Sequence, residues 1–534
     1  MGVGATRRTG SRNRCRVMRL PSTFVAGALL CCAASVLAQV EEQQQPEARA
    51  PRAWSIVPLV SVQETYTDNV GLRSTDRRSD WVTDVSSGVR VEGRTARLNL
   101  HLDYRLHELL YARASGATQT QQELNSRMSL TAVENLLFVD MDGAIFRQPL
   151  SPLGTQSAAA YSINSNSVET SSYRFSPYLR SRLGGYVDSE VRYSKSQTHA
   201  DSSIASGLTV DAWSGRFVGD TMFSVLGWAL DVSQQRSQYS RGPTNDSEQV
   251  RGMLNVRVTP ELKLSASLGK ERNDYLSATM ESYDTRGVGF EWHPTQRTNI
   301  SVFREKRFFG NGHTIALSHK WSQSVISYTD NRNVSTTPTQ NNAVNLGVTN
   351  YDFKNAEYMA TIPDPVARAA AVAAFFAANP AYAPNALIGT LSANLLTSQA
   401  TAQRRQQLSY LIQGVRNDLT IDWLRAEDER LGSAFLVGLA DLSQVTTLRQ
   451  QGMSFGWVYR LTPMTSLNVT GSQMHSIGSG EGGLKATQKS LAASLSTKLG
   501  ARTRAALSAR RTVYDSPTNP YTENAISSAV SVEF

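Results

Sequence analysis

Cysteine is nearly absent from this 534-residue chain: Cys15, Cys31 and Cys32 are its three copies, and all lie within the first 38 residues. The remainder can form neither disulfides nor thiolate metal sites. Long apolar runs are also missing, because the longest apolar run is Phe24 to Leu37 and a membrane-spanning helix needs about 20 residues. We therefore expect no helical membrane anchor.

A large excess of one charge sign is missing once the N-terminus is set aside. The formal charge is +9, but six arginines lie in the first 38 residues, which leaves 48 basic against 45 acidic residues. We therefore expect no nucleic-acid partner. The chain is polar on average, with a mean hydropathy of -0.32, and it lacks the helix and strand alternation of an α/β enzyme. A membrane barrel explains the low hydropathy because water covers its inner face and lipid only its outer one.

The N-terminus predicts export. Residues 1–38 combine the arginines with the apolar run and end on Val36-Leu37-Ala38, which is typical of a secretory signal peptide. Met18 is an alternative start, and a lipoprotein-like box before Cys31 has large residues where small ones are required. Residues 39–53 are polar, so we expect a disordered periplasmic lead-in. The barrel is predicted at 54–534.

The last ten residues indicate a strand with one apolar face. Ile526, Val530 and Val532 share the parity of Phe534, whereas Glu533 has the opposite parity. An ordinary terminal strand is one interpretation. The other is the closing strand of an outer-membrane barrel, which pairs with the first strand and leaves no edge in lipid. By similarity to such barrels, we assign Ile526, Val530, Val532 and Phe534 as the barrel-insertion signal that the barrel-assembly machinery recognises.

Period-2 alternation of apolar and polar residues recurs along the chain, beginning at 54–66 and 81–91. One face of each such strand suits lipid and the other suits water. Parity predicts these charged residues on the inner face: Asp103, Arg105, Lys263, Glu291, Asp422, Arg460 and Lys498. Because both signs occur, we expect weak ion selectivity.

Short turns separate the strands at the period of one hairpin. Pro260 and Pro294 are 34 residues apart, and Pro463 and Gly500 are 37 residues apart. Further turns are expected near Gly93, Asp142, Gly184, Leu226, Trp321 and Arg416. The fold class is therefore all-β, a large antiparallel transmembrane barrel of about 22 strands, or roughly 18 to 20 because 146–168 is a poor strand. A propeller or solenoid would bury both strand faces, and one face here is too polar for that.

One insertion, at about 335–400, interrupts this rhythm. Asp364-Pro365 reads as the start of a helix that covers Val366 to Ala378, and Asn379-Pro380 reads as its stop. The helix is nearly uncharged and needs a surface on which to pack. We expect either a lid that folds into the barrel and narrows the pore, or a loop that packs on the rim.

Reactive residues are sparse and scattered. The seven histidines include no pair at a His-x-His or His-x3-His spacing, so we expect neither a metal nor another cofactor. The acid-rich stretches 140–142 and 427–429 lie near predicted strand ends, where solvated charge is ordinary. Tryptophan and tyrosine near strand ends are typical of interface girdles. We expect that the protein is not an enzyme.

The stretch Glu64-Thr65-Tyr66-Thr67-Asp68-Asn69-Val70 and the later turn and strand at 460–467 carry a family resemblance. Residues 54–112, and more weakly most of the remaining chain, resemble a family of outer-membrane β-barrels encoded with the PEP-CTERM/exosortase system, which accompanies exopolysaccharide loci in Gram-negative bacteria. The resemblance implies location in the cell outer membrane and an association with that system, but no defined activity.

Two functions fit these expectations. The first is a porin-like pore or conduit for a hydrophilic solute or exopolysaccharide, since a barrel of this size encloses water unless it is plugged. The alternative is a non-conducting structural or scaffold barrel for surface sorting or assembly. The expected partners are outer-membrane lipid and lipopolysaccharide, the barrel-assembly machinery, and a polysaccharide if one is the solute.

Overall fold

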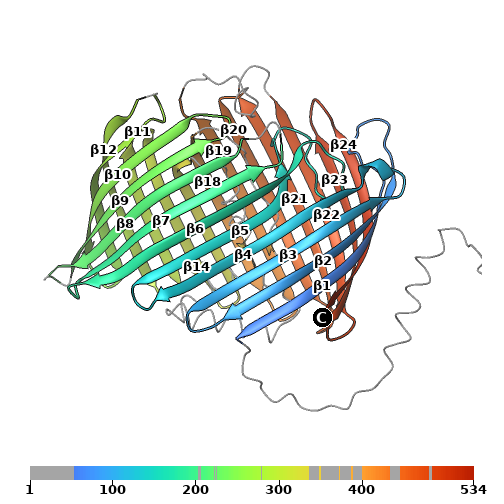
Figure 1. The fold of residues 1–534 in the computed structure, drawn as a ribbon, viewed down its shortest axis with the longest axis horizontal. Helices are drawn as coiled ribbons and strands as arrows, with labels where there is room; N and C mark the ends of the chain where they lie inside the picture. Colours follow the sequence, from blue (N-terminus) through green and yellow to red (C-terminus); the bar gives the residue numbers. More distant parts are fainter. Residues whose placement is uncertain are drawn as a thin grey trace, which may run out of the picture. The chain divides into compact units, whose positions relative to one another are not determined.

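The described part of the chain is built around one large closed β-sheet (Figure 1). The computed structural model describes residues 53–202, 206–221, 223, 225–277, 279–335, 348–349, 372, 387–388, 400–432, 445–479 and 484–534. Residues 53–534 form one compact unit, and its main sheet contains 22 strands. The predicted fold class, a large antiparallel barrel, is confirmed.

The strands of the wall run obliquely (Figure 1), and each wall strand pairs with the wall strands before and after it. They are β1 (Trp54–Thr67), β2 (Asp80–Arg94), β3 (Leu98–Tyr111), β4 (Gln119–Val133), β5 (Leu137–Pro149), β6 (Ser167–Leu183), β7 (Val187–Ala200), β8 (Leu208–Asp220), β9 (Leu226–Tyr239), β10 (Thr244–Arg257), β11 (Leu262–Asn273), β12 (Glu281–Thr295), β13 (Thr298–Arg307), β14 (Gly310–Lys320), β15 (Ser324–Ser335), β18 (Thr401–Gln413), β19 (Asn417–Arg430), β20 (Thr447–Arg460), β21 (Thr465–Ser479), β22 (Lys485–Lys498), β23 (Thr503–Asp515) and β24 (Tyr521–Glu533). A single 3-10 turn, η1 (Ser115–Ala117), follows β3, and β16 (Val348–Thr349) pairs with β17 (Leu387–Ile388) apart from the wall.

The barrel closes where β1 pairs antiparallel with β24. The paired residues run from Leu59 opposite Glu533 to Thr67 opposite Ala525, and the backbone N–H of Phe534 donates to the carbonyl oxygen of Pro58 at 3.0 Å. Every strand of the wall therefore has a partner on both sides. No wall edge is left with unpaired backbone groups, as a barrel in lipid requires.

Connections at one end of the barrel are short, and most of those at the other end are longer, although only residues 308–309 join β13 to β14 there. The short turns, which define the short-turn end, lie where expected near Gly184, Pro260 and Gly500. The turn predicted near Asp142 is wrong, because Asp142 lies inside β5 and the chain turns at 134–136, where Asn135 has a φ of +58°. Asp-Met-Asp-Gly has the composition of a turn, yet its side chains alternate between the two faces of a strand.

Alternation along the strands separates an outer apolar face from an inner polar face. On β24, Ile526 and Val530 are exposed on the outer face, whereas Glu523 on the opposite parity is buried. The same parity places the seven predicted inner-face residues, Asp103 to Lys498, on the inside of the wall, as predicted. Within the described residues, no helix has the length and apolarity to cross a membrane.

The outer face carries different side chains at its two ends. At the short-turn end it presents tryptophans, among them Trp54, Trp292 and Trp321, which are exposed. At the opposite, long-loop end it presents a charged belt, which we define by the ion pairs Lys195–Asp211, Arg236–Asp246, Arg272–Glu248 and Arg449–Glu427. An apolar band between an aromatic girdle and a charged belt matches the profile of a bilayer.

The predicted lid cannot be placed. The helix expected at Val366 to Ala378 lies outside the described residues apart from Val372, which is helical. Most of the insertion at 335–400 is likewise outside them, so the lid and the rim loop both remain predictions.

Candidate functional site

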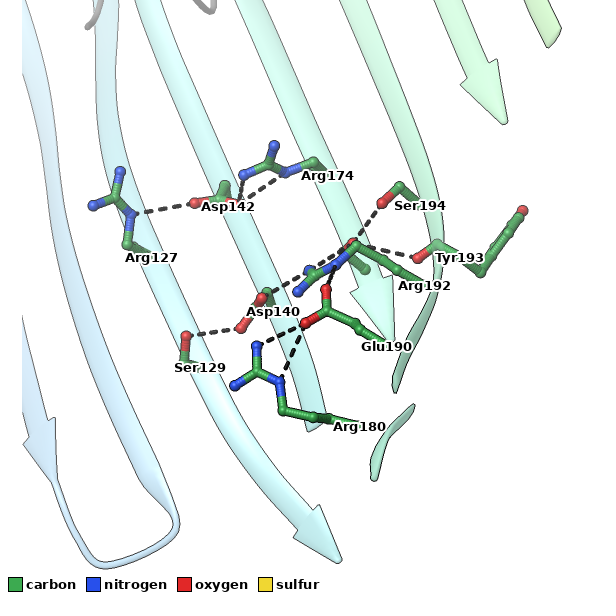
Figure 2. A network of polar contacts seen from close by, with 11 residues as sticks. Arg127, Ser129, Asp140, Asp142, Arg174, Arg180, Glu190, Arg192, Tyr193 and Ser194 are labelled. Carbon is green, nitrogen blue, oxygen red and sulfur yellow. Dashed lines mark hydrogen bonds and ion pairs between the residues drawn. The ribbon is translucent and has the colours of Figure 1, made fainter. Parts of the chain in front are cut away.

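Inward-facing side chains of neighbouring strands form rows of alternating charge across β4 to β7 (Figure 2). Register sets the rows: Arg127 is opposite Asp142, and Asp142 is opposite Arg174. The Arg127 guanidinium donates to the Asp142 carboxylate at 3.3 Å, and Arg174 donates to its other oxygen at 2.6 Å. One carboxylate on β5 thus holds an arginine on each side.

A second row lies closer to the short-turn end (Figure 2). Arg192 donates to Asp140 at 2.9 Å and to Glu190 at 3.1 Å. Arg180 donates to the second oxygen of Glu190 at 2.7 Å, and Ser129 donates to Asp140 at 2.8 Å. These contacts cross four strands and fix the side chains relative to one another.

An aromatic pair borders this row on the inner face. The rings of Phe138 and Tyr178 stack with centroids 5.1 Å apart and planes 16° apart. The Arg192 guanidinium carbon lies 3.8 Å from the centre of the Tyr178 ring, within the range of a cation–π contact. Flat apolar surface and guanidinium groups therefore lie together on the inner wall.

Similar pairs continue around the inner face in both directions. Beyond β7, Arg216 approaches Asp231 at 3.9 Å and Arg251 binds Asp231 at 3.1 Å. On the other side, Arg90 and Arg105 each contact Asp103 at 3.1 Å. The inner wall is therefore lined by fixed charge over at least β2 to β10.

Where the two partners of a pair differ in exposure, the arginine faces the lumen and the carboxylate lies against the wall; the other arginines of these pairs are as buried as their partners. The Arg127 side chain is 72% exposed and its partner Asp142 28%. The same asymmetry holds for Arg180 at 57% against Glu190 at 29%. A long arginine side chain reaches past a short carboxylate, so water and solutes in the lumen meet guanidinium groups first.

The loop between β5 and β6, residues 150–166, folds across the inner face. The Tyr161 hydroxyl donates to the Glu523 carboxylate of β24 at 3.1 Å, and Arg510 of β23 donates to the Tyr161 oxygen at 2.7 Å. Arg510 also pairs with Glu523 at 3.2 Å. Burial raises the pKa of Tyr161, so its hydroxyl stays protonated and acts as a donor at neutral pH.

Further contacts tie the same loop to more distant strands. The Tyr514 hydroxyl donates to the Gly154 carbonyl at 2.6 Å, and Leu153 packs against the buried pair Val445 and Leu448. The loop therefore runs inside the barrel from β5 to β20. Sequence reasoning found only a poor strand at 146–168, and the length of this loop was the one available signal.

The predicted insertion signal lies on the closing strand. Ile526 is opposite Tyr66 on β1, Val530 is opposite Val62, and Val532 is opposite Val60. Phe534 is exposed beyond the end of β24. The four residues share the outer face, and their recognition by assembly machinery remains a prediction.

Removal of Phe534 alone is expected to lower the amount of barrel in the membrane while synthesis and export continue. The lost groups are an exposed aromatic ring and one backbone hydrogen bond at the seam. The measurement is the membrane-inserted fraction after urea extraction. Unchanged levels relative to the full chain would contradict the assignment.

The residues considered for chemistry have structural roles. Asp140 and Asp142 lie within β5 and hold arginines, which corrects their predicted position near a strand end. A Gly-x-Ser-x-Gly sequence occurs at 452–456, but it lies inside β20, and Ser454 donates to Asp422 at 3.4 Å. A nucleophile elbow requires a sharp strand-to-helix turn. Among the described residues, no group of three or more His, Cys, Asp or Glu could hold a metal ion.

A closed antiparallel wall with an apolar outer face and a charged inner face defines a transmembrane β-barrel of the outer-membrane type. In sequence comparisons, no family model and no curated protein matches the chain.

Among solved structures, the chain is similar to the FrpB iron transporter from Neisseria meningitidis, with 9% identity, a TM-score of 0.49, and coverage of 91% of this chain and 82% of that one. It is also similar to the siderophore receptor PirA from Acinetobacter baumannii, with 8% identity, a TM-score of 0.46, and coverage of 90% and 80%. A third is OccAB2 from Acinetobacter baumannii, with 10% identity, a TM-score of 0.32, and coverage of 90% and 98%. Nothing about the solute of this chain follows from these likenesses.

Proposed function

We propose that the protein is an outer-membrane pore for hydrophilic solutes and that it favours anions. The observation that supports this proposal is the arrangement of the inner wall, where exposed arginines such as Arg127 and Arg180 cover less exposed carboxylates. Charges that line a pore select the ions that pass it. Mixed signs in the sequence predict weak selectivity, and the unequal exposure of the two signs shifts our expectation towards anions.

The solute that fits this wall is an acidic polysaccharide. Guanidinium groups bind carboxylates through paired hydrogen bonds, and the stacked Phe138 and Tyr178 offer an apolar surface beside them. The resemblance to barrels of the PEP-CTERM/exosortase system supports an exopolysaccharide in this role. Export by the signal peptide at 1–38 and insertion by the barrel-assembly machinery belong to the same proposal.

The loop at 150–166 would limit the size of the solute. Its attachment to Glu523 and Tyr514 keeps it against the inner wall near the long-loop end. A pore of this strand number would otherwise be wide.

The proposal is tested by single-channel recording on the purified full chain in a planar bilayer. We expect discrete conductance steps and a reversal potential in a KCl gradient that indicates chloride preference, because the exposed guanidinium groups attract anions. Heat-modifiable migration on a gel is the control for folding. A folded barrel without conductance, or with cation preference, would contradict the proposal.

A second function, a non-conducting scaffold barrel, is favoured by one specific observation. On β19 the inner-face residues from Asp418 to Asp428 are buried: Asp428 and Ala426 are fully buried, and Arg405 of β18 pairs with Asp428 at 3.0 Å. This part of the inner wall does not face open water. The same recording separates the two functions, because a scaffold would give no steps.

A further inference from the structure

A hollow of about 560 Å³ lies on the outer face of the barrel. It crosses β13, β14, β15, β18 and β19, within the charged belt at the long-loop end. Its basic side chains are those of Arg304, Arg332 and Arg404, and the His313 imidazole lies beside them. Four nitrogen-bearing side chains from four strands thus meet on a surface that would face lipid.

One buried carboxylate holds two of these groups in place. Asp330 is 3% exposed and accepts hydrogen bonds from Arg404 at 2.6 and 3.0 Å. It also contacts a His313 ring nitrogen at 3.0 Å and accepts from Gln406 at 2.9 Å. Its oxygens are therefore occupied, and Arg404 and His313 are fixed at the edge of the hollow.

The remaining two arginines have no acidic partner among the described residues. Arg332 donates to the backbone carbonyl of Asn311 at 3.1 Å, and Arg304 is exposed. Besides Asp330, the acids that line the hollow are Glu427, which pairs with Arg449 at 3.0 Å, and the exposed Glu429. Arg304, and the N–H groups of Arg332 other than the one bound to Asn311, therefore offer guanidinium donors that no carboxylate of the described wall occupies.

The floor of the hollow is apolar. Val302 and Ile315 line it. Each lies two positions along its strand from Arg304 or His313, on the same face and towards the apolar band. A ligand that fills this site would therefore have an anionic head at the arginines and a hydrocarbon portion against the band. An anionic lipid has both, and guanidinium groups bind phosphate oxygens through paired hydrogen bonds.

We propose that this hollow binds the phosphate group of an anionic lipid in the membrane leaflet at the long-loop end, with Arg304 and Arg332 as the principal donors. The inference rests on the proposed membrane location of the barrel and names one lipid site on it. Arg404 and His313, held by Asp330, complete the basic edge of the site.

The test measures lipid retained by the purified full-length barrel in native mass spectrometry after incubation with phosphatidic acid or phosphatidylcholine in detergent. The variant combines Arg304→Ala with Arg332→Ala. The matched control combines Lys489→Ala with Arg511→Ala, which removes the same charge from exposed outer-face positions of β22 and β23. Heat-modifiable migration verifies that both variants fold.

We expect the parent and the control to retain phosphatidic acid in preference to phosphatidylcholine. The Arg304/Arg332 variant should bind phosphatidic acid at least about tenfold more weakly than the parent, because two charge-assisted hydrogen bonds are lost. Equal retention by variant and control would overturn the site. Displacement of the lipid by millimolar inorganic phosphate would overturn the lipid assignment and indicate a free anion. Conductance is recorded separately, so a barrel that retains lipid but does not conduct contradicts the proposed pore alone.

Discussion

Replacing Arg127, Arg174 and Arg180 together by glutamate is expected to turn an anion-favouring pore into a cation-favouring one. Each change substitutes a negative for a positive charge at an exposed position on the inner wall. The neighbouring carboxylates, including Asp142, also lose their partners and add to the negative potential. In a KCl gradient the reversal potential should change sign, and the effect should be largest at low salt because ions screen it within about 10 Å at 0.1 M.

The matched control reverses three arginines on the other face of the same wall, Arg236, Arg272 and Arg449. They are about as exposed and are also paired with carboxylates. The change in net charge is identical, but these groups would face the lipid headgroups. We expect the sign of the reversal potential to stay that of the parent. A shift of equal size in both triple variants would show that the inner-wall arginines do not govern selectivity.

Replacing Glu523 by leucine is expected to detach Tyr161 and its part of the loop at 150–166 from β24 and to destabilise the barrel. Glu523 is 1% exposed and accepts from Tyr161, Thr67 and Arg510. Removing one member of a buried ion pair costs roughly 3–5 kcal/mol because the other charge remains buried. We expect a lower temperature for heat-modifiable unfolding and a higher single-channel conductance.

A second substitution separates these two effects. Combining Glu523→Leu with Arg510→Met removes both charges, so most of the lost stability should return, while the loop stays detached and the conductance stays high. Tyr161→Phe deletes only the hydroxyl and should cost about 1 kcal/mol. Parent-like conductance in the double variant would show that the loop does not narrow the pore.

Much of the wall could be predicted because the sequence of each strand shows the alternation and the flanking turn residues of a strand. Proline and glycine at Pro260 and Gly500 cannot easily continue a ladder, and alternation sets which side chains face lipid. Turn residues and alternation are both local features of the sequence, so they can be recognised without knowing which strands pair with each other. The turn predicted near Asp142 failed because local composition suggested a turn where the cross-strand pairs with Arg127 and Arg174 stabilise a strand.

For the candidate site, the sequence predicted only which side chains face the inside of the barrel, and not which of them are in contact. Asp103 and Arg105 were expected on the inner face, where two residues of one strand can contact each other, but the contact of Asp103 with Arg90 depends on the register of β2 against β3. The loop at 150–166 could not be placed at all, because Tyr161 meets Glu523 across 362 positions of sequence. Contacts of that range depend on how the barrel closes, which local patterns do not encode.

Closure of β1 on β24 also determines the order in which the barrel can form. Thr67 and Glu523, which meet across this seam, are separated by 456 positions, whereas every other wall pairing joins consecutive strands of the wall, with β16, β17 and the insertion lying only between β15 and β18. Each doubling of a closed loop costs only about 0.6 kcal/mol, so the seam adds little to the equilibrium cost, but pairing over such a distance is slow. The hairpins should therefore form first, and the pairing of β1 with β24 should form last. Throughout that interval β1 and β24 are open edges with which any other strand could pair. The risk of misassembly therefore depends on how long the barrel takes to close, and not on the stability of the closed barrel.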